Sequence, residues 1–239
     1  MRLLITNIGI LAGLDKEQKL RLCGSEMKQF STIENAWLLI EDSRFKDWGK
    51  MSEMPSEGIP SDKTIDAGGG AVLPSWCDPH THIVFAGSRE GEFVDKICGL
   101  SYAEIAKRGG GILNSADLLH TLSEDELYSS AMRRVDEIIR KGTGCVEIKS
   151  GYGLNTEDEL KMLRVIRRIK ETTPLKVKST FLGAHAVGRG YSQPDYVDLV
   201  VNEMIPEVGK EHLADYVDVF CDEGFFTPEE TARILEAAS

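Results

Sequence analysis

The 239-residue chain has no long apolar run and no surplus of positive charge. Its opening stretch, MRLLITNIGILAGLDKEQ, is too short to cross a bilayer and lacks the small-residue cleavage site of a signal peptide. The formal net charge is -11, which disfavours binding to the phosphate backbone of a nucleic acid. We therefore expect neither a membrane nor a nucleic acid as a partner.

Cysteine pairs are also missing. The five cysteines are odd in number, widely spaced and contain no C-x-x-C motif; they are Cys23, Cys77, Cys98, Cys145 and Cys221. This pattern favours reduced thiols, mostly buried, over a disulfide framework. It predicts a cytoplasmic protein.

The first 66 residues differ in texture from the rest of the chain. RLLITNIGIL and NAWLLIED are typical of short strands, and the Pro- and Ser-rich segment MSEMPSEGIPSDK leads to Asp66. We predict a small β module over residues 1–66, forming part of a composite β-sandwich, and a second domain over residues 67–239.

Strand and helix patterns alternate in that second domain. The predicted strands are AVLPSWCDPH, GCVEIKSG, LKVKSTFLGAH and YVDVFCDEG. Predicted helices run from Ser123 to Lys141, from Thr156 to near Pro174, around Tyr196 to Met204, and from Thr227 onward. Three of these helices begin with a capping-box pattern; the pairs are Ser123 with Glu126, Thr156 with Glu159, and Thr227 with Glu230.

Four strand–helix repeats without hairpin signals indicate parallel strands joined by crossovers. Either a (β/α)8 barrel or a doubly wound sheet fits this pattern, but neither the dinucleotide-binding nor the P-loop glycine fingerprint follows any strand. A complete barrel needs eight such units in about 250 residues. We therefore predict an α/β protein holding the first half of a (β/α)8 barrel, in a truncated chain.

Barrel enzymes place their active sites at the carboxyl ends of the strands. Chemically capable side chains follow all four predicted strands. They are His80 and His82 after the first, Tyr152 after the second, His185 after the third, and Asp222 and Glu223 after the fourth. This distribution predicts an active site at that end of the sheet.

Asp78-Pro79-His80-Thr81-His82 is the sharpest motif. In an extended backbone, residues two apart share a face with their side-chain origins roughly 6–7 Å apart. Two imidazoles at that spacing can bind one metal ion, whereas on a helix they would diverge. Two solvated loop histidines remain the alternative.

The same segments resemble a known family. LPSWCDPHTHIVFAGSREGEF, SYAEIAKRGGGI, CVEIKSGYGL and TFLGAHAV are similar to successive segments of the imidazolonepropionase family, within the metal-dependent amidohydrolase superfamily. The Asp-x-His-x-His pattern indicates only the superfamily, while the combination of these segments is far more specific. The resemblance covers nearly the whole chain and is weakest over the first 60 residues.

The resemblance implies a role for each matching residue. His80 and His82 would bind a single zinc or iron ion, and Arg89 would bind the propionate group of the substrate. Tyr152 would hydrogen-bond the substrate, and His185 would act beside the reacting carbonyl. Without the family, Arg89 would be interpreted as a surface arginine, and Tyr152 could equally be a packed tyrosine at the barrel rim. For His185 the alternative is a core histidine, but its strand-end position and its agreement with His80 and His82 favour a functional role.

The implied reaction is hydrolysis of the cyclic amide of 4-imidazolone-5-propanoate, a small-molecule substrate, to N-formimino-L-glutamate in histidine degradation. A homodimer is left open. Family members carry a further histidine, an aspartate and a glutamate on later strands, which would lie beyond Ser239. Two imidazoles are fewer than the three protein ligands usual in catalytic zinc sites, so we expect the 239-residue chain alone to be almost inactive.

Three alternative functions stay open on the sequence. The first is another amidohydrolase that acts on a cyclic amide or amidine. The second is a non-catalytic fragment that uses Arg89 and Tyr152 only to bind a small anion. The third, a doubly wound binding domain, is disfavoured by the missing glycine fingerprint. His120 and His212, which lie within or beside helical patterns, are predicted to be structural.

Overall fold

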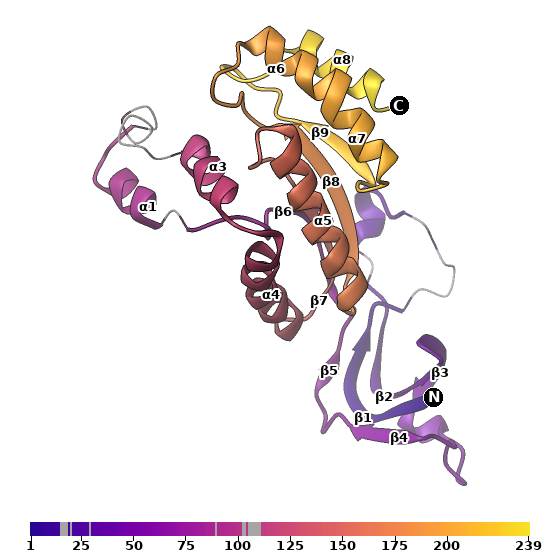
Figure 1. Cartoon of the computed structure of the whole chain (residues 1–239). Helices are drawn as coiled ribbons and strands as arrows, with labels where there is room; N and C mark the ends of the chain where they lie inside the picture. The colour runs from indigo at the N-terminus through magenta and orange to yellow at the C-terminus, as the bar shows by residue number, and fades with distance from the viewer. Residues whose placement is uncertain (15–18, 20, 29, 89, 102–103, 105–110) are drawn as a thin grey trace. The chain divides into compact units, whose positions relative to one another are not determined.

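A computed structural model describes residues 1–14, 19, 21–28, 30–88, 90–101, 104 and 111–239 of the chain (Figure 1). The chain divides into two compact units, Met1–Pro74 and Ser75–Ser239. Each unit has its own sheet, so each is considered by itself.

The first unit is a small β structure. Its sheet has the order β3-β2-β1-β4. Strand β5 also pairs with β1, at residues closer to the carboxyl end of β1 than those that pair with β4. Strand β1 is antiparallel to β2 and parallel to β4 and β5. The elements are β1 (Arg2–Ala12), η1 (Gly24–Lys28), β2 (Thr32–Glu41), β3 (Arg44–Lys50), η2 (Met51–Glu53), β4 (Lys63–Asp66) and β5 (Ala71–Val72).

The strand predicted over AVLPSWCDPH is two strands that lie in different units. Ala71 and Val72 form β5, which pairs with Ile10 and Leu11 of β1. A new strand, β6 (Trp76–Thr81), then begins the sheet of the second unit. Pro74 lies between them, and because proline has no backbone N–H it cannot continue a ladder. The first unit therefore extends past Asp66, where the sequence pattern placed its end.

The second unit contains a four-stranded sheet in which every neighbouring pair is parallel. Its order is β6-β7-β8-β9, the order of the chain itself. After β6 come β7 (Thr143–Lys149), β8 (Lys176–Ala184) and β9 (Tyr216–Val219). The predicted α/β class with a parallel sheet is confirmed, although β9 is shorter than the strand predicted from YVDVFCDEG.

Helices connect these strands. The capping boxes of Ser123 with Glu126 and of Thr227 with Glu230 are confirmed. Helices α1 and α3 were not predicted. None of the described helices combines the length and apolar character needed to cross a bilayer. The helices are α1 (Glu90–Ile97), α3 (Ile112–Thr121), α4 (Glu124–Arg140), α5 (Thr156–Thr172), α6 (Gln193–Leu199), the π-helical turn η3 (Val200–Met204), α7 (Ile205–Lys210) and α8 (Pro228–Ala237).

The predicted capping box of α5 is wrong. The N-cap is Asn155 rather than Thr156, and its side chain accepts the backbone N–H of Asp158. Asparagine is a strong N-cap residue, and placed one position earlier it starts the helix first. The side chain of Glu159 is therefore not used in the cap and turns instead towards a buried loop.

The two faces of the parallel sheet have different compositions. Alternate side chains on β7 and β8 are apolar and fully buried in the main core beside the helices; they are Val146, Ile148, Val177 and Phe181. Between them stand residues that line a groove of about 450 Å³ on the opposite face, among them Cys145, Glu147, Lys149, Lys178 and Thr180. We call these the helix face and the groove face.

Candidate active site

Three aromatic side chains come from the carboxyl ends of three adjacent strands. His82 directly follows β6, Tyr152 lies three residues beyond β7, and His185 directly follows β8. Because parallel strands end at the same edge of a sheet, their following residues come together there. His80, within β6, completes what we call the ring cluster: His80, His82, Tyr152 and His185.

The rings of this cluster are in mutual contact. The centroids of His82 and His185 are 5.3 Å apart with an interplanar angle of 11°, which is a stacked arrangement. The ring of Tyr152 lies 5.3 Å from His82 and 5.4 Å from His185. His80 lies 5.7 Å from His82, edge to face. The structure thus brings together four of the five residues predicted for the site.

His82 is half-buried within the ring cluster. Its pKa is lowered to about 4, chiefly by burial and also by the neighbouring His185, His80 and Lys149, while Asp218 opposes them. Its Nδ1 atom is buried and has no hydrogen-bond partner among the described residues. At neutral pH this imidazole is therefore uncharged, the form in which histidine binds a metal ion.

The segment that carries the two histidines is anchored to the neighbouring strand. The Thr81 hydroxyl donates to the backbone carbonyl of Glu147 at 2.6 Å, and the Thr81 N–H points to Glu147 Oε2 at 3.4 Å. Glu147 Oε1 in turn accepts from Lys149 Nζ at 2.7 Å, and the same ammonium reaches Asp218 Oδ2 on β9 at 3.0 Å. These polar contacts join β6, β7 and β9.

The loop after β7, which carries Tyr152, is bound by the buried carboxyl group of Glu159. Glu159 Oε2 accepts the N–H of Gly151 at 3.0 Å, and Oε1 accepts those of Gly153 at 2.7 Å and Leu154 at 3.1 Å. Glu159 is 0% exposed. Burial raises the pKa of this carboxyl, and hydrogen bonds from Ser150 and the three backbone groups oppose the rise.

His185 is oriented by the same loop. Its Nδ1 lies 3.0 Å from the carbonyl oxygen of Gly151. A carbonyl oxygen only accepts, so Nδ1 carries the proton in this contact and the neutral ring has its lone pair on Nε2. Gly151 has φ 110°, and a Cβ there would come within 3.0 Å of His185 Nδ1. Glycine is therefore required at this position.

Arg89 falls outside the described residues. Asp222 and Glu223 follow β9 as predicted and are exposed, with Asp222 accepting the backbone N–H of Glu223 in a turn.

The prediction that the cysteines are mostly buried is wrong. All five lie in the described part of the chain as free thiols; Cys145 is half-buried and the other four are exposed. Cys77 and Cys145 are register partners on β6 and β7 and line the groove face of the sheet. The alternation of residues in a strand predicts which residues share a face of the sheet, but not which of the two faces the helices cover.

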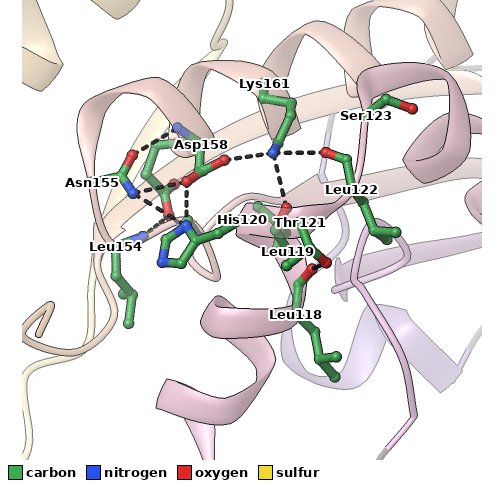
Figure 2. A network of polar contacts seen from close by, with 12 residues as sticks. Leu118, Leu119, His120, Thr121, Leu122, Ser123, Leu154, Asn155, Asp158 and Lys161 are labelled. Carbon is green, nitrogen blue, oxygen red and sulfur yellow. Dashed lines mark hydrogen bonds and ion pairs between the residues drawn. The ribbon is translucent and has the colours of Figure 1, made fainter.

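His120 lies in a network of polar contacts with Asn155, Asp158 and Lys161 (Figure 2). Its Nδ1 contacts Asp158 Oδ2, and Asp158 Oδ1 pairs with Lys161 at 2.5 Å. Lys161 also donates to the carbonyl oxygens of Leu119 and Leu122 at 2.9 and 3.0 Å. The network therefore joins the end of α3 to the first turn of α5.

The metal-binding capacity of the described residues is partial. No three His, Cys, Asp or Glu side chains within the described ranges gather in a way that could hold a metal ion. The two neighbouring imidazoles of His80 and His82, one with a buried unpartnered nitrogen, are suitable donors for zinc or iron. They supply two ligands.

Sequence reasoning missed Glu147, Lys149 and Glu159. The signal available for Glu159 was the pair of glycines at 151 and 153, since a glycine-rich turn beside an acidic residue often needs its backbone N–H groups satisfied. Glu147 and Lys149 alternate on one face of β7, which identifies a polar strand face but not its partners.

Comparison with known proteins identifies close relatives. No protein-family model matches the chain. The chain is 55% identical over 240 residues to an imidazolonepropionase of Christiangramia forsetii, covering 100% of this chain and 58% of the relative. It is 50% identical over 236 residues to that of Flavobacterium johnsoniae, covering 98% of the chain and 57% of the relative. The chain thus spans somewhat over half the length of these relatives.

Solved structures share the fold at low sequence identity. The triazine hydrolase from Arthobacter aurescens gives a TM-score of 0.61 at 14% identity, covering 99% of this chain and 51% of that one. Atrazine chlorohydrolase from Arthrobacter aurescens, complexed with zinc, gives 0.55 at 15%, covering 97% and 50%. The chain therefore shares the fold of these two enzymes. With half or more of its residues identical to the two relatives over almost its entire length, the chain belongs to the imidazolonepropionase family.

Proposed function

We propose that the protein containing this chain hydrolyses the cyclic amide of 4-imidazolone-5-propanoate to N-formimino-L-glutamate. The ring cluster carries the proposal, because it gathers two imidazoles, a phenol and a third imidazole where three parallel strands end. The 55% identity to an imidazolonepropionase supports the choice of substrate.

His80 and His82 are the proposed ligands of one zinc or iron ion. The neutral state of His82 and its unpartnered Nδ1 support this role. When bound, the ion would lower the pKa of a water molecule and so supply a nucleophile near neutral pH. A catalytic zinc site usually has three protein ligands, so the proposal requires at least one donor beyond these two histidines.

His185 is proposed to stabilise charge and move a proton at the reacting carbonyl. Its Nδ1 faces the carbonyl oxygen of Gly151, and Nε2 is the ring nitrogen proposed to exchange a proton with the substrate. The protonated ring would donate from Nε2 to the developing oxyanion.

Tyr152 and Arg89 are proposed to position the substrate. The Tyr152 ring packs against both His82 and His185, which supports a role for this residue beside the substrate. The planar guanidinium of Arg89 matches a carboxylate, the group at the end of the propionate tail. Holding the tail would orient the ring amide for attack.

The proposal extends to the architecture. The four parallel strands would be the first half of a (β/α)8 barrel, and the β structure of the first unit would be part of a composite β-sandwich. The order of the parallel sheet, in which each strand pairs with the next in the chain, supports the barrel.

Turnover of imidazolonepropionate by the protein at the length of its relatives is the decisive measurement, with guanine and dihydroorotate as comparison substrates. We expect hydrolysis of the imidazolone alone and about one equivalent of zinc or iron by elemental analysis. Preferred turnover of either comparison substrate would refute the proposed substrate.

Arg89→Ala tests the substrate-binding assignment. Loss of the guanidinium should raise KM strongly while metal content stays intact, because the residue acts on the tail and not on the ion. Lost metal with an unchanged KM would contradict the role.

A further inference from the structure

We propose that Glu159 is a positioning residue for the active site, whose buried carboxyl fixes the loop of residues 151–154 and thereby sets the places of Tyr152 and His185. Only the kinetic test of this inference rests on the proposed function. The tests of structure do not depend on the substrate.

The backbone conformation of the loop of residues 151–154 is unfavourable without contacts from outside the loop. Gly151 has φ 110° and Leu154 has φ 55°, so the chain enters the left-handed region at two of four positions. For leucine this region is unfavourable, and it persists only where the surroundings impose it. Here the surroundings act through the carboxyl of Glu159, which accepts hydrogen bonds from the N–H groups of Gly151, Gly153 and Leu154.

Close packing makes the arrangement specific. A Cβ at Gly153 would lie 2.4 Å from the backbone nitrogen of Glu159, so the loop touches the first turn of α5 directly. The glutamate thus reaches three donors that would otherwise be buried without partners. Buried unpaired donors are strongly unfavourable, so the loop is tied to the helix through this one side chain.

Both site residues depend on this attachment. Tyr152 lies between Gly151 and Gly153, the two glycines whose N–H groups Glu159 binds. His185 points its Nδ1 at the carbonyl of the same Gly151. One carboxyl oxygen therefore holds the N–H of Gly151, the residue whose carbonyl oxygen orients His185, and the other holds the peptide that follows Tyr152.

The preceding residue provides a matched control. Asp158 is also a buried carboxyl in the first turn of α5, and it also makes several polar contacts. Its partners are His120, Lys161 and Asn155, which belong to the network joining α3 to α5 (Figure 2). Substitution of Asp158 disturbs the same helix turn without touching the backbone of residues 151–153.

Glu159→Gln is the test variant, with Asp158→Asn as its control. Glutamine keeps the shape but presents an NH₂ group to at least one of the three donors in either amide orientation. We expect the loop amides of Gly151, Gly153 and Leu154 to exchange with solvent roughly tenfold faster in Glu159→Gln, because one or more protecting bonds are lost. The ring ¹⁵N signal of His185 should shift as well. Asp158→Asn should leave both observables as in the wild type.

The kinetic arm uses the protein at the length of its relatives. Glu159→Gln should lower kcat/KM for imidazolonepropionate by roughly tenfold or more, with metal content unchanged, while Asp158→Asn leaves kcat/KM near the wild-type value. If the wild type does not hydrolyse the imidazolone, the proposed function fails, and the exchange and ¹⁵N measurements still decide the role of Glu159.

Two results would overturn the inference. One is an unchanged His185 signal and unchanged loop exchange in Glu159→Gln, or equal changes in Asp158→Asn. The other needs no variant and so holds even if Glu159→Gln does not fold: wild-type amides of Gly151 and Gly153 that exchange as fast as those of an unprotected loop.

Discussion

The helix face and the groove face of the parallel sheet are built from the same strands and have opposite properties. On the helix face, Val146, Ile148 and Phe181 are each 0% exposed. On the groove face, β7 instead carries Cys145, Glu147 and Lys149. Because consecutive strand residues point to opposite faces, two residue types can alternate without conflict. The difference implies that the helix face contributes most of the folding free energy, while the groove face supports the site.

The largest expected effect breaks the helix face. Phe181→Ala should lower the free energy of unfolding by about 3–5 kcal/mol, because it removes a fully buried ring and leaves a cavity beneath α7 and α8. Chemical denaturation monitored by circular dichroism measures it. A loss below about 1 kcal/mol would mean that this face is not the stabilising one.

Lys149→Met tests the groove face at its most buried charge. The substitution removes a cation that bonds to both Glu147 and Asp218, and we expect a loss of about 1–3 kcal/mol in unfolding free energy. An unchanged stability would show that the polar contacts between β7 and β9 contribute nothing.

The alkaline pH dependence is the control for this variant. Burial alone would lower the pKa of Lys149, but its bonds to Glu147 and Asp218 raise it overall. A raised pKa in the folded state gives stability that is complete below the usual value of 10.5 and is lost as pH rises through the folded value. The wild type should therefore lose this contribution above about pH 10.5, and Lys149→Met should lack that part of the slope.

Thr81→Val tests the hydrogen bond between β6 and β7 beside the site. Valine keeps the branched shape and removes the hydroxyl that donates to the Glu147 carbonyl, so about 1 kcal/mol of unfolding free energy should be lost. Thermal unfolding gives the stability, and metal titration reports on the flanking His80 and His82. Weaker metal binding with little change in melting temperature would show that Thr81 acts mainly on the histidines.

Cys77→Ser has the smallest expected effect. The thiol is exposed on the groove face, so the change in unfolding free energy should stay within about 0.5 kcal/mol. A thiol reagent should modify Cys23, Cys77, Cys98 and Cys221 in the folded 239-residue chain. Protection of Cys77 from the reagent would contradict its placement on an open face.

Local signals predicted much of the fold. The boxes at Ser123 and Thr227 bind groups three residues away, so the sequence contains both partners. The start of α5 was misplaced because Asn155 and Thr156 are both capping residues, and the local pattern does not rank them. The break at Pro74 was missed because the apolar run continues on both sides of it.

The candidate site was predicted as far as strand ends could define it. His82, Tyr152 and His185 follow strands that proved to be parallel neighbours, so their proximity followed from topology. The supporting residues depend on partners that are backbone groups or lie on distant strands. Glu159 binds peptide N–H groups that every sequence contains, and Lys149 meets Asp218 from β9 across the intervening strand β8.

The consecutive order of the parallel sheet also bears on how the chain folds. Each strand pairs with the one synthesised just before it, so a nascent chain always meets a sheet edge that is already in place. No strand has to insert between two others, and the crossovers from β7 to β8 and from β8 to β9 are short relative to the whole unit, which keeps the entropic cost of these steps low. The sheet can therefore grow one strand at a time, from the amino terminus onward, during translation.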